Sequence, residues 1–277
     1  MYCSQATFSV KKGTDRLNKL QDDQESLAVL EWLTSIDFAT QQQDFIGRRQ
    51  PGTGQWFLES EQYQAWIESD QQIIFCPGIP GAGKTILAAI VIEDLTKRFR
   101  NDPTIGIAYV YLNFRRHGEQ TADNLIASLA KQLSRNQPSL PDCVRKIHEN
   151  HKDKQSRPTS DELSSVLQTV VGIYSKVFIV VDALDECQIL GGHRNRLLSE
   201  LFAMQSTGKA SVLATSRFLP EITERFEHEN TLEIRADDED VRNYVAGRMT
   251  DLPGFVGRSV ELQEEIKDGI VNAVSGM

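Results

Sequence analysis

Residues 78–85 read GIPGAGKT and constrain the fold more than any other part of this 277-residue sequence. They follow a short apolar run at 73–75 and lead into a helical pattern with Ile86, Leu87 and Ile90 on its inner face. The glycines allow the backbone to curl so that successive N–H groups point at one anion, and the helix N-terminus adds its dipole. The segment therefore predicts a phosphate-binding loop between a buried strand and a helix.

The match to the pattern GxxxxGK[ST], known as Walker A, assigns a role to each loop residue. Lys84 would reach the β- and γ-phosphates, and the Thr85 hydroxyl would bind Mg²⁺. The alternative is a glycine-rich turn in which Lys84 is merely solvated, but type, order and context of the residues all weigh against it. The expected nucleotide contacts are Gly78, Ile79, Pro80, Gly81, Ala82, Gly83, Lys84, Thr85 and Ile86.

Four further apolar, β-branched runs follow along the chain, at 105–112, 177–181, 211–215 and 231–234. Continuous runs of this length suit strands that are buried on both faces, as in a parallel sheet. Helical stripes of leucine and valine lie between the runs. Because strand and helix alternate, we expect an α/β sandwich around a central parallel sheet.

An acidic cluster follows the run at 177–181. In open α/β sheets, the carboxyl ends of the strands face the ligand crevice. Asp182 would therefore orient Mg²⁺ through a coordinated water, in the manner of a Walker B acid. Asp185 or Glu186 would polarise the attacking water, and Glu186 is favoured. The alternative is an ordinary acidic loop after a strand, which is less credible beside a phosphate-binding loop.

A cation closes the strand at 211–215. Arg217 would sense the γ-phosphate or neutralise charge that develops in the transition state. The alternative is a surface arginine that caps the next turn. Arg115 and Arg116 follow the second strand in a similar way, but there a solvated face is the favoured interpretation.

The composition limits the class of partner. The net charge of −9 argues against a protein that coats nucleic acid, since such binding rests on basic patches. No run of 18 apolar residues occurs, so no membrane span is expected. Four scattered cysteines suggest neither a zinc site nor a disulfide framework. We expect a cytoplasmic protein with a nucleotide ligand and with neither nucleic-acid nor membrane partners.

The chain divides into three expected parts. Residues 1–50 carry one modest amphipathic patch and are interpreted as a helical arm, or as a partly ordered linker. Residues 51–236 form the nucleotide-binding domain, entered through a loop with Trp56 as a buried anchor. Residues 237–277 begin a C-terminal helical region that is incomplete.

The choice among phosphate-loop proteins follows from what the sequence lacks. No N/T-K-x-D motif for reading guanine follows the loop, and no arginine-rich lid of a small metabolic kinase stands out. The additional-strand class of phosphate-loop NTPases remains.

Several segments together resemble the NACHT-type NTPase module of the STAND class, in the nephrocystin-like form of fungal multidomain proteins with ankyrin or WD repeats. The segments are GTGQWFL, CPGIPGAGKTILAAIVIEDL, YVYLNFRR, VFIVVDALDEC, LATSR and IRADDEDVRNYVAGRM. The resemblance implies a three-layer fold with a five-stranded sheet, in which the strand before Arg217 lies between the phosphate-loop strand and the Asp182 strand. It also implies ATP or ADP with Mg²⁺ as ligands.

By the same resemblance, the module would be a slow ATPase switch in innate-immunity or incompatibility-like signalling, closed with ADP and oligomeric with ATP. Adenine would lie near Phe45 to Arg48. Family members continue beyond 273–277 into a winged-helix region and a repeat sensor domain. We therefore expect protein partners to act through a separate sensor or effector domain, and we expect looser nucleotide binding and poor switching. The alternative function is a non-catalytic interaction module that a bound nucleotide stabilises.

Overall fold

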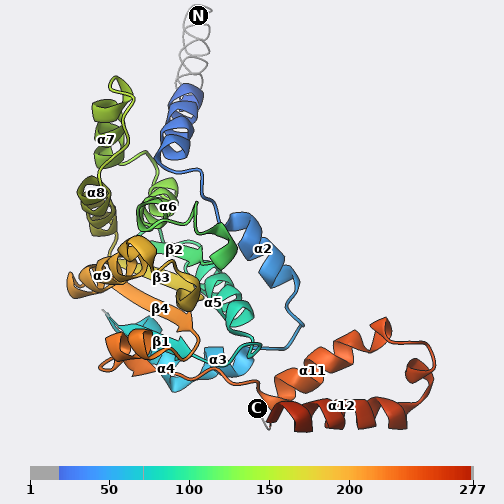
Figure 1. The fold of residues 1–277 in the computed structure, drawn as a ribbon. Helices are drawn as coiled ribbons and strands as arrows, with labels where there is room; N and C mark the ends of the chain where they lie inside the picture. Colours follow the sequence, from blue (N-terminus) through green and yellow to red (C-terminus); the bar gives the residue numbers. More distant parts are fainter. Residues whose placement is uncertain (1–18, 71, 276–277) are drawn as a thin grey trace, which may run out of the picture.

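A computed structural model describes residues 19–70 and 72–275 (Figure 1), so the first part of the predicted arm lies outside the described residues. Five parallel strands form one sheet in the order β2-β3-β4-β1-β5. This confirms the predicted α/β fold and the position of β4 between β1 and β3. The strands are β1 (Ile73–Pro77), β2 (Ile105–Tyr111), β3 (Lys176–Asp182), β4 (Ala210–Ser216) and β5 (Asn230–Thr231).

The fifth strand is shorter than expected. Its ladder covers Asn230 and Thr231, not 231–234. The chain nevertheless continues beside β1, since the Leu232 N–H donates to the Phe75 carbonyl at 2.9 Å and the Ile234 N–H to the Pro77 carbonyl at 2.7 Å. This segment therefore reaches the carboxyl end of the sheet, next to the glycine loop.

Helices cover both faces of the sheet (Figure 1). The connection from β1 to β2 crosses the sheet in one direction, and those from β2 to β3 and from β3 to β4 return in the other. Because such crossovers are right-handed, their helices lie on opposite faces. Helix α5 (Lys84–Arg98), with α2 (Ala39–Gly47) beside it, covers one face. The other carries α6 (Ala122–Arg135), α8 (Ser160–Ile173) and α9 (His193–Ser206), with α7 (Asp142–Lys152) beyond α8.

Short helices connect these layers at the bottom of the view in Figure 1. Helix α3 (Gln55–Glu59) is followed by α4 (Glu61–Glu68), and α10 (Pro220–Thr223) follows β4. Tyr63, Trp66 and Ile67 of α4 are buried. The predicted anchor is different: Phe57 is buried, whereas Trp56 is only partly buried because its indole N–H reaches a carboxylate.

The second half of the N-terminal arm packs on the sheet domain. A helix spans residues 19–33, and its buried Leu30 and Leu33 belong to the main core. The buried Lys131 of α6 donates to the Thr34 carbonyl and to the Glu31 carboxylate, each at 2.8 Å. The helix therefore docks on its own domain at α6, and Leu27 stays exposed.

A glutamine protects the free edge of the sheet at β2. The Gln132 side chain accepts from the Tyr109 N–H at 3.0 Å and donates to the Tyr109 carbonyl at 2.8 Å. Its amide thus occupies the backbone groups that another strand would otherwise pair with.

Replacing Gln132 by methionine is expected to lower the free energy of unfolding by about 1–2 kcal/mol, because both hydrogen bonds to Tyr109 are lost at similar side-chain volume. It should also increase aggregation, since an edge strand is uncovered. Urea unfolding and light scattering measure both effects. Gln62→Met, on an exposed position of α4, is the matched control, and equal stability of the two variants would contradict the capping role.

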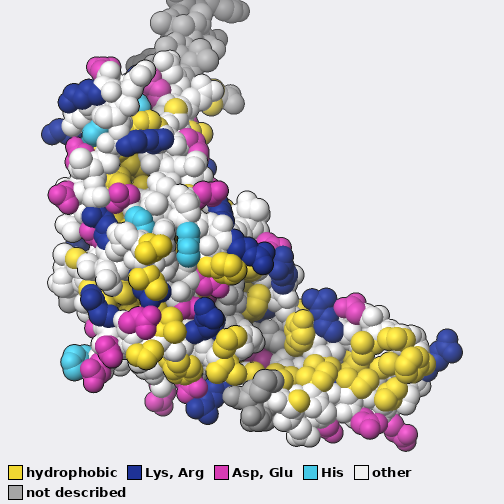
Figure 2. Space-filling view, in the orientation of Figure 1, with side chains coloured by type: hydrophobic (Ala, Val, Ile, Leu, Met, Phe, Trp, Pro, Cys, Tyr) yellow, Lys and Arg dark blue, Asp and Glu magenta, His cyan; other side chains and the backbone are white. Residues whose placement is uncertain are grey.

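A second, smaller core lies in the C-terminal part, between α11 (Asp238–Arg248) and α12 (Val260–Ser275). Val245, Met249 and Val256 are its buried centre. The two helices project from the sheet domain, and Figure 2 shows apolar side chains along them. Tyr244 of α11 is half exposed, because α11 packs mainly against α12 and not against a complete layer.

Over residues 19–70 and 72–275, no helix is both long and apolar enough to cross a membrane.

Candidate functional site

The glycine loop has a backbone that only glycine adopts easily. Gly81 and Gly83 have φ angles of 85° and 89°, in the left-handed region. Gly78 is needed for a different reason: a Cβ there would lie 2.4 Å from the Ile234 carbonyl oxygen, where the chain after β5 passes the loop. The loop is thus shaped both by its own glycines and by the strand edge beside it.

The loop leaves several of its N–H groups without a hydrogen bond to the described part of the chain. Gly78 donates to the Ser216 carbonyl and Ala82 to the Ile79 carbonyl. Within the described chain, no hydrogen bond is made by the N–H groups of Gly81, Gly83 or Lys84. The last two lie at the N-terminus of α5, where the positive end of the helix dipole favours an anion.

The Lys84 side chain folds back across the loop. Its Nζ donates to the carbonyls of Gly78 and Ile79, each at 2.8 Å. Partial burial lowers the pKa of Lys84 below its ordinary value, and the carboxylates of Asp185 and Asp182 oppose that shift. The amine is therefore held over the loop by two weak acceptors, which an anionic oxygen could replace.

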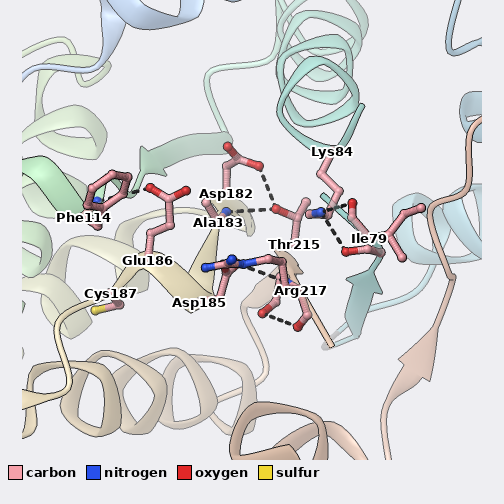
Figure 3. A network of polar contacts seen from close by, with 12 residues as sticks. Ile79, Lys84, Phe114, Asp182, Ala183, Asp185, Glu186, Cys187, Thr215 and Arg217 are labelled. Carbon is pink, nitrogen blue, oxygen red and sulfur yellow. Dashed lines mark hydrogen bonds and ion pairs between the residues drawn. The ribbon is translucent and has the colours of Figure 1, made fainter. Parts of the chain in front are cut away.

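Asp182 is the centre of the polar network at the end of β3 (Figure 3). Its carboxylate accepts from the Thr85 hydroxyl at 2.8 Å and from the Thr215 hydroxyl at 2.7 Å. The Ala183 N–H in turn donates to Thr215 Oγ1 at 2.9 Å. Burial raises the pKa of Asp182 above its ordinary value, while the hydrogen bonds from Thr215 and Thr85 oppose the rise.

The predicted metal residues Thr85 and Asp182 are therefore brought together from positions 97 residues apart. Sequence reasoning did not assign Thr215 a role. The available signal was a hydroxyl at the end of a buried strand, because the parallel register pairs Val181 with Ala214 and so places Thr215 beside Asp182.

The two acids after Asp182 point to opposite sides of β3. Asp185 accepts from the Arg217 N–H at 3.0 Å and from Arg217 Nε, at the end of β4. Glu186 accepts from the Phe114 N–H at 3.2 Å, in the turn η1 (Phe114–Arg116) after β2. Ala183, which has a left-handed backbone with φ 58°, turns the chain just before them.

A cavity of about 450 Å³ lies between these groups and the glycine loop. Its wall includes the loop, Asp182, Asp185, Glu186, Arg217 and the Phe114 ring. The candidate catalytic residues of the sequence therefore share one cavity with the phosphate loop.

A second cavity of about 500 Å³ lies on the other side of the loop, and both are lined by Gly81, Gly83 and Ile86. Arg48 lies in its wall, near the predicted position of adenine, whereas Phe45 packs against the Tyr111 ring at 4.8 Å. The sequence pattern did not indicate most of its lining, which includes Gln50, Thr53, Trp56, Leu87, Asp237, Val241, Tyr244 and Ile270.

Asp240 joins the two sides of this second cavity. Its carboxylate accepts from the Gly54 N–H at 2.8 Å and from Trp56 Nε1 at 3.2 Å. Burial raises the pKa of Asp240, and the hydrogen bond from Gly54 opposes the rise. The contact ties α11 to the segment before β1, 184 residues earlier in the sequence.

A glycine loop at a helix N-terminus, a buried acid on the third strand and the strand order together define a P-loop NTPase-like module. Residues 52–217 match the family described as nephrocystin 3, N-terminal. The chain belongs to this family, which confirms the resemblance seen in the sequence motifs.

Comparison with individual proteins gives one curated relative and remote structural neighbours. The vegetative incompatibility protein HET-E-1 of Podospora anserina is 27% identical over 139 residues, which cover 48% of this chain and 10% of that protein. The replication initiator DnaA bound to AMPPCP and single-stranded DNA is 16% identical, with a TM-score of 0.41 over 83% of this chain and 64% of that chain. The Aeropyrum pernix Orc1 protein in complex with DNA is 14% identical, with a TM-score of 0.45 over 82% and 54%.

Proposed function

We propose that this chain binds ATP and ADP with Mg²⁺, hydrolyses ATP slowly and acts as a nucleotide switch in signalling. One observation carries the proposal: the Thr85 hydroxyl donates to the Asp182 carboxylate in the wall of a cavity that the glycine loop also lines. A strand–loop–helix turn without a nucleotide has no need for a buried carboxylate at this point.

The residues present fit Mg²⁺ and a polyphosphate. Thr85 and Asp182 supply two oxygen atoms that lie 2.8 Å apart. Mg²⁺ prefers oxygen ligands, and it is commonly held by one or two such groups together with phosphates. When bound, the ion would neutralise charge on the phosphate oxygens. The N–H groups of Gly81, Gly83 and Lys84 would bind the phosphates, and the Lys84 amine would exchange its two carbonyl acceptors for phosphate oxygens.

Hydrolysis needs a base near the attacking water, and Glu186 is the better placed acid. One of its oxygens accepts from the Phe114 N–H, and the carboxylate lies in the wall of the phosphate cavity. Arg217 would stabilise negative charge on the terminal phosphate. Turnover should be slow, because an arginine supplied by a partner is worth about 10³–10⁵ in rate where one is used.

The second cavity is suited to the base and the ribose. It begins where the phosphate cavity ends, at the loop, and apolar side chains from α5 and α11 make up much of its wall. An aromatic base stacks well on such side chains. We assign adenine to it by resemblance, close to Arg48 and on the opposite side of the loop from Asp182.

The separate cores support a domain boundary near residues 236 and 237, with the C-terminal helices as a distinct region. In contrast, residues 29–38 share the main core, so this part of the arm and the proposed domain 51–236 are one packed body. The similarity to an incompatibility protein supports a role in signalling. The proposal also includes a cytoplasmic location, protein partners that act through other domains, and a homo-oligomer that forms in a nucleotide-dependent way.

Calorimetric titration of the whole chain with ATP, ADP and GTP tests the proposal. We expect one site, ATP and ADP binding more tightly than GTP, and weaker ATP binding when EDTA removes Mg²⁺, because the ion screens phosphate charge beside Asp182. Absence of heat with every nucleotide would refute the function. Tight ADP binding in the sub-micromolar range would refute the looser binding expected from the sequence.

Asp240→Ala is expected to weaken ATP and ADP binding by the same factor, about tenfold, since it frees α11 from one wall of the base cavity without touching the phosphates. Fluorescence titration with labelled nucleotides measures both affinities. Glu239→Ala, on an exposed position of the same helical turn, is the control for a charge removed from α11. If Asp240→Ala lowered the affinity for ATP but not for ADP, a role of Asp240 at the base would be contradicted.

A further inference from the structure

Asp185 and Arg217 form a close pair at the edge of the phosphate cavity. Both carboxylate oxygens of Asp185 are engaged, one by the main-chain N–H of Arg217 and the other by its Nε. The Asp185 side chain is only 3% exposed, whereas that of Arg217 is 52% exposed. The acid is therefore buried beneath the arginine and already occupied.

The contact leaves the outer part of the guanidinium available. Within residues 19–70 and 72–275, the guanidinium of Arg217 makes its hydrogen bond to Asp185 through Nε, and neither Nη atom makes a hydrogen bond. A guanidinium that is held at Nε presents its two Nη groups as a planar fork, which matches a phosphate. Figure 3 shows these nitrogens on the side of Asp182 and Glu186.

The position of the pair selects one phosphate. The base cavity and the phosphate cavity meet at Gly81 and Gly83, and neither Asp185 nor Arg217 lines the base cavity. A nucleotide that runs from one cavity to the other would bring its last phosphate nearest to Arg217. A diphosphate would end one phosphoryl group earlier.

Glu186 is placed differently and does not share this role. Its carboxylate is held on the β2 side by Phe114, and Asp185 is held on the β4 side by Arg217. Both acids lie in the short turn η2 (Leu184–Glu186), which follows the left-handed backbone at Ala183. These two acids are adjacent in the sequence, but they contact residues that follow two different strands, β2 and β4.

We propose that Asp185 is a positioning residue that aims Arg217 at the terminal phosphate, so that the pair makes the site prefer a triphosphate to a diphosphate. This rests on the proposed nucleotide binding. It removes Asp185 from the candidates for the base that activates water.

The test uses Asp185→Asn, Arg217→Ala and the double variant of the full chain, with Asp251→Asn as control. Asp251 pairs with Arg248 on the exposed surface, far in sequence from the site. Affinities for ADP and for a non-hydrolysable ATP analogue are measured by calorimetry. Urea unfolding without nucleotide gives the coupling between the two positions.

We expect each single variant to lower the preference for the triphosphate by about tenfold, with unchanged ADP affinity. The double variant should lose no more of the triphosphate preference than Arg217→Ala alone, because each change disrupts the same Asp185–Arg217 pair. Unfolding should show coupling between the positions, and Asp251→Asn should change nothing.

Two results would overturn the inference while nucleotide binding stands. In one, Asp185→Asn keeps the wild-type preference and instead slows single-turnover hydrolysis. In the other, the double variant loses as much of the triphosphate preference as the two single variants do together. Failure of the wild type to bind either nucleotide would instead refute the proposed function, and the inference with it.

Discussion

Lys84→Ala should weaken ATP binding by about 100-fold, because a charge-assisted contact to the phosphates is lost. The fold should persist. In the structure, the amine bonds to the two loop carbonyls of Gly78 and Ile79, and Lys84 is the first residue of α5, with its side chain outside the core.

Calorimetry gives the affinity of Lys84→Ala, and circular dichroism with urea unfolding reports its fold. Lys97→Ala is the matched control: the residue lies on the same helix, its side chain is 72% exposed, and it pairs with Glu93. Unchanged ATP affinity in Lys84→Ala would refute the assignment of the glycine loop as a phosphate cradle.

Glu186→Gln should slow ATP hydrolysis in a single turnover by at least about 100-fold, since a general base contributes about 10²–10⁴. Nucleotide affinity should hardly change. Glutamine keeps an oxygen that can accept from the Phe114 N–H, so the turn after β2 stays in place. What the variant loses is the basic carboxylate in the phosphate cavity.

The same experiment separates the two functions that the sequence left open. Glu68→Gln, on an exposed position of α4, controls for the loss of one negative charge. A slow wild-type rate that Glu186→Gln abolishes supports the ATPase. Identical, background-level rates in wild type and variant would leave only a nucleotide-stabilised interaction module.

Much of the fold could be predicted because it depends on local patterns. Buried strands have continuous apolar runs, and four of the five begin and end within one or two residues of the expected positions. The exception is β5, which is an edge element with exposed residues and so carries a weaker apolar signal. Helix α7 was not predicted, since only Val144 and Ile147 of it are buried.

The sequence by itself determined the phosphate loop and the acid on β3, because glycine conformation and a strand that ends in a carboxylate are encoded by adjacent residues. Only the tertiary structure decided what the neighbouring groups do. The parallel register brings Thr215 to Asp182, and the turn at Ala183 sends Asp185 to Arg217 and Glu186 to Phe114. The second cavity, on the other side of the loop, likewise depends on the contact of α11 with a segment 184 residues earlier in the sequence. Contacts between distant segments depend on packing, which no local pattern specifies.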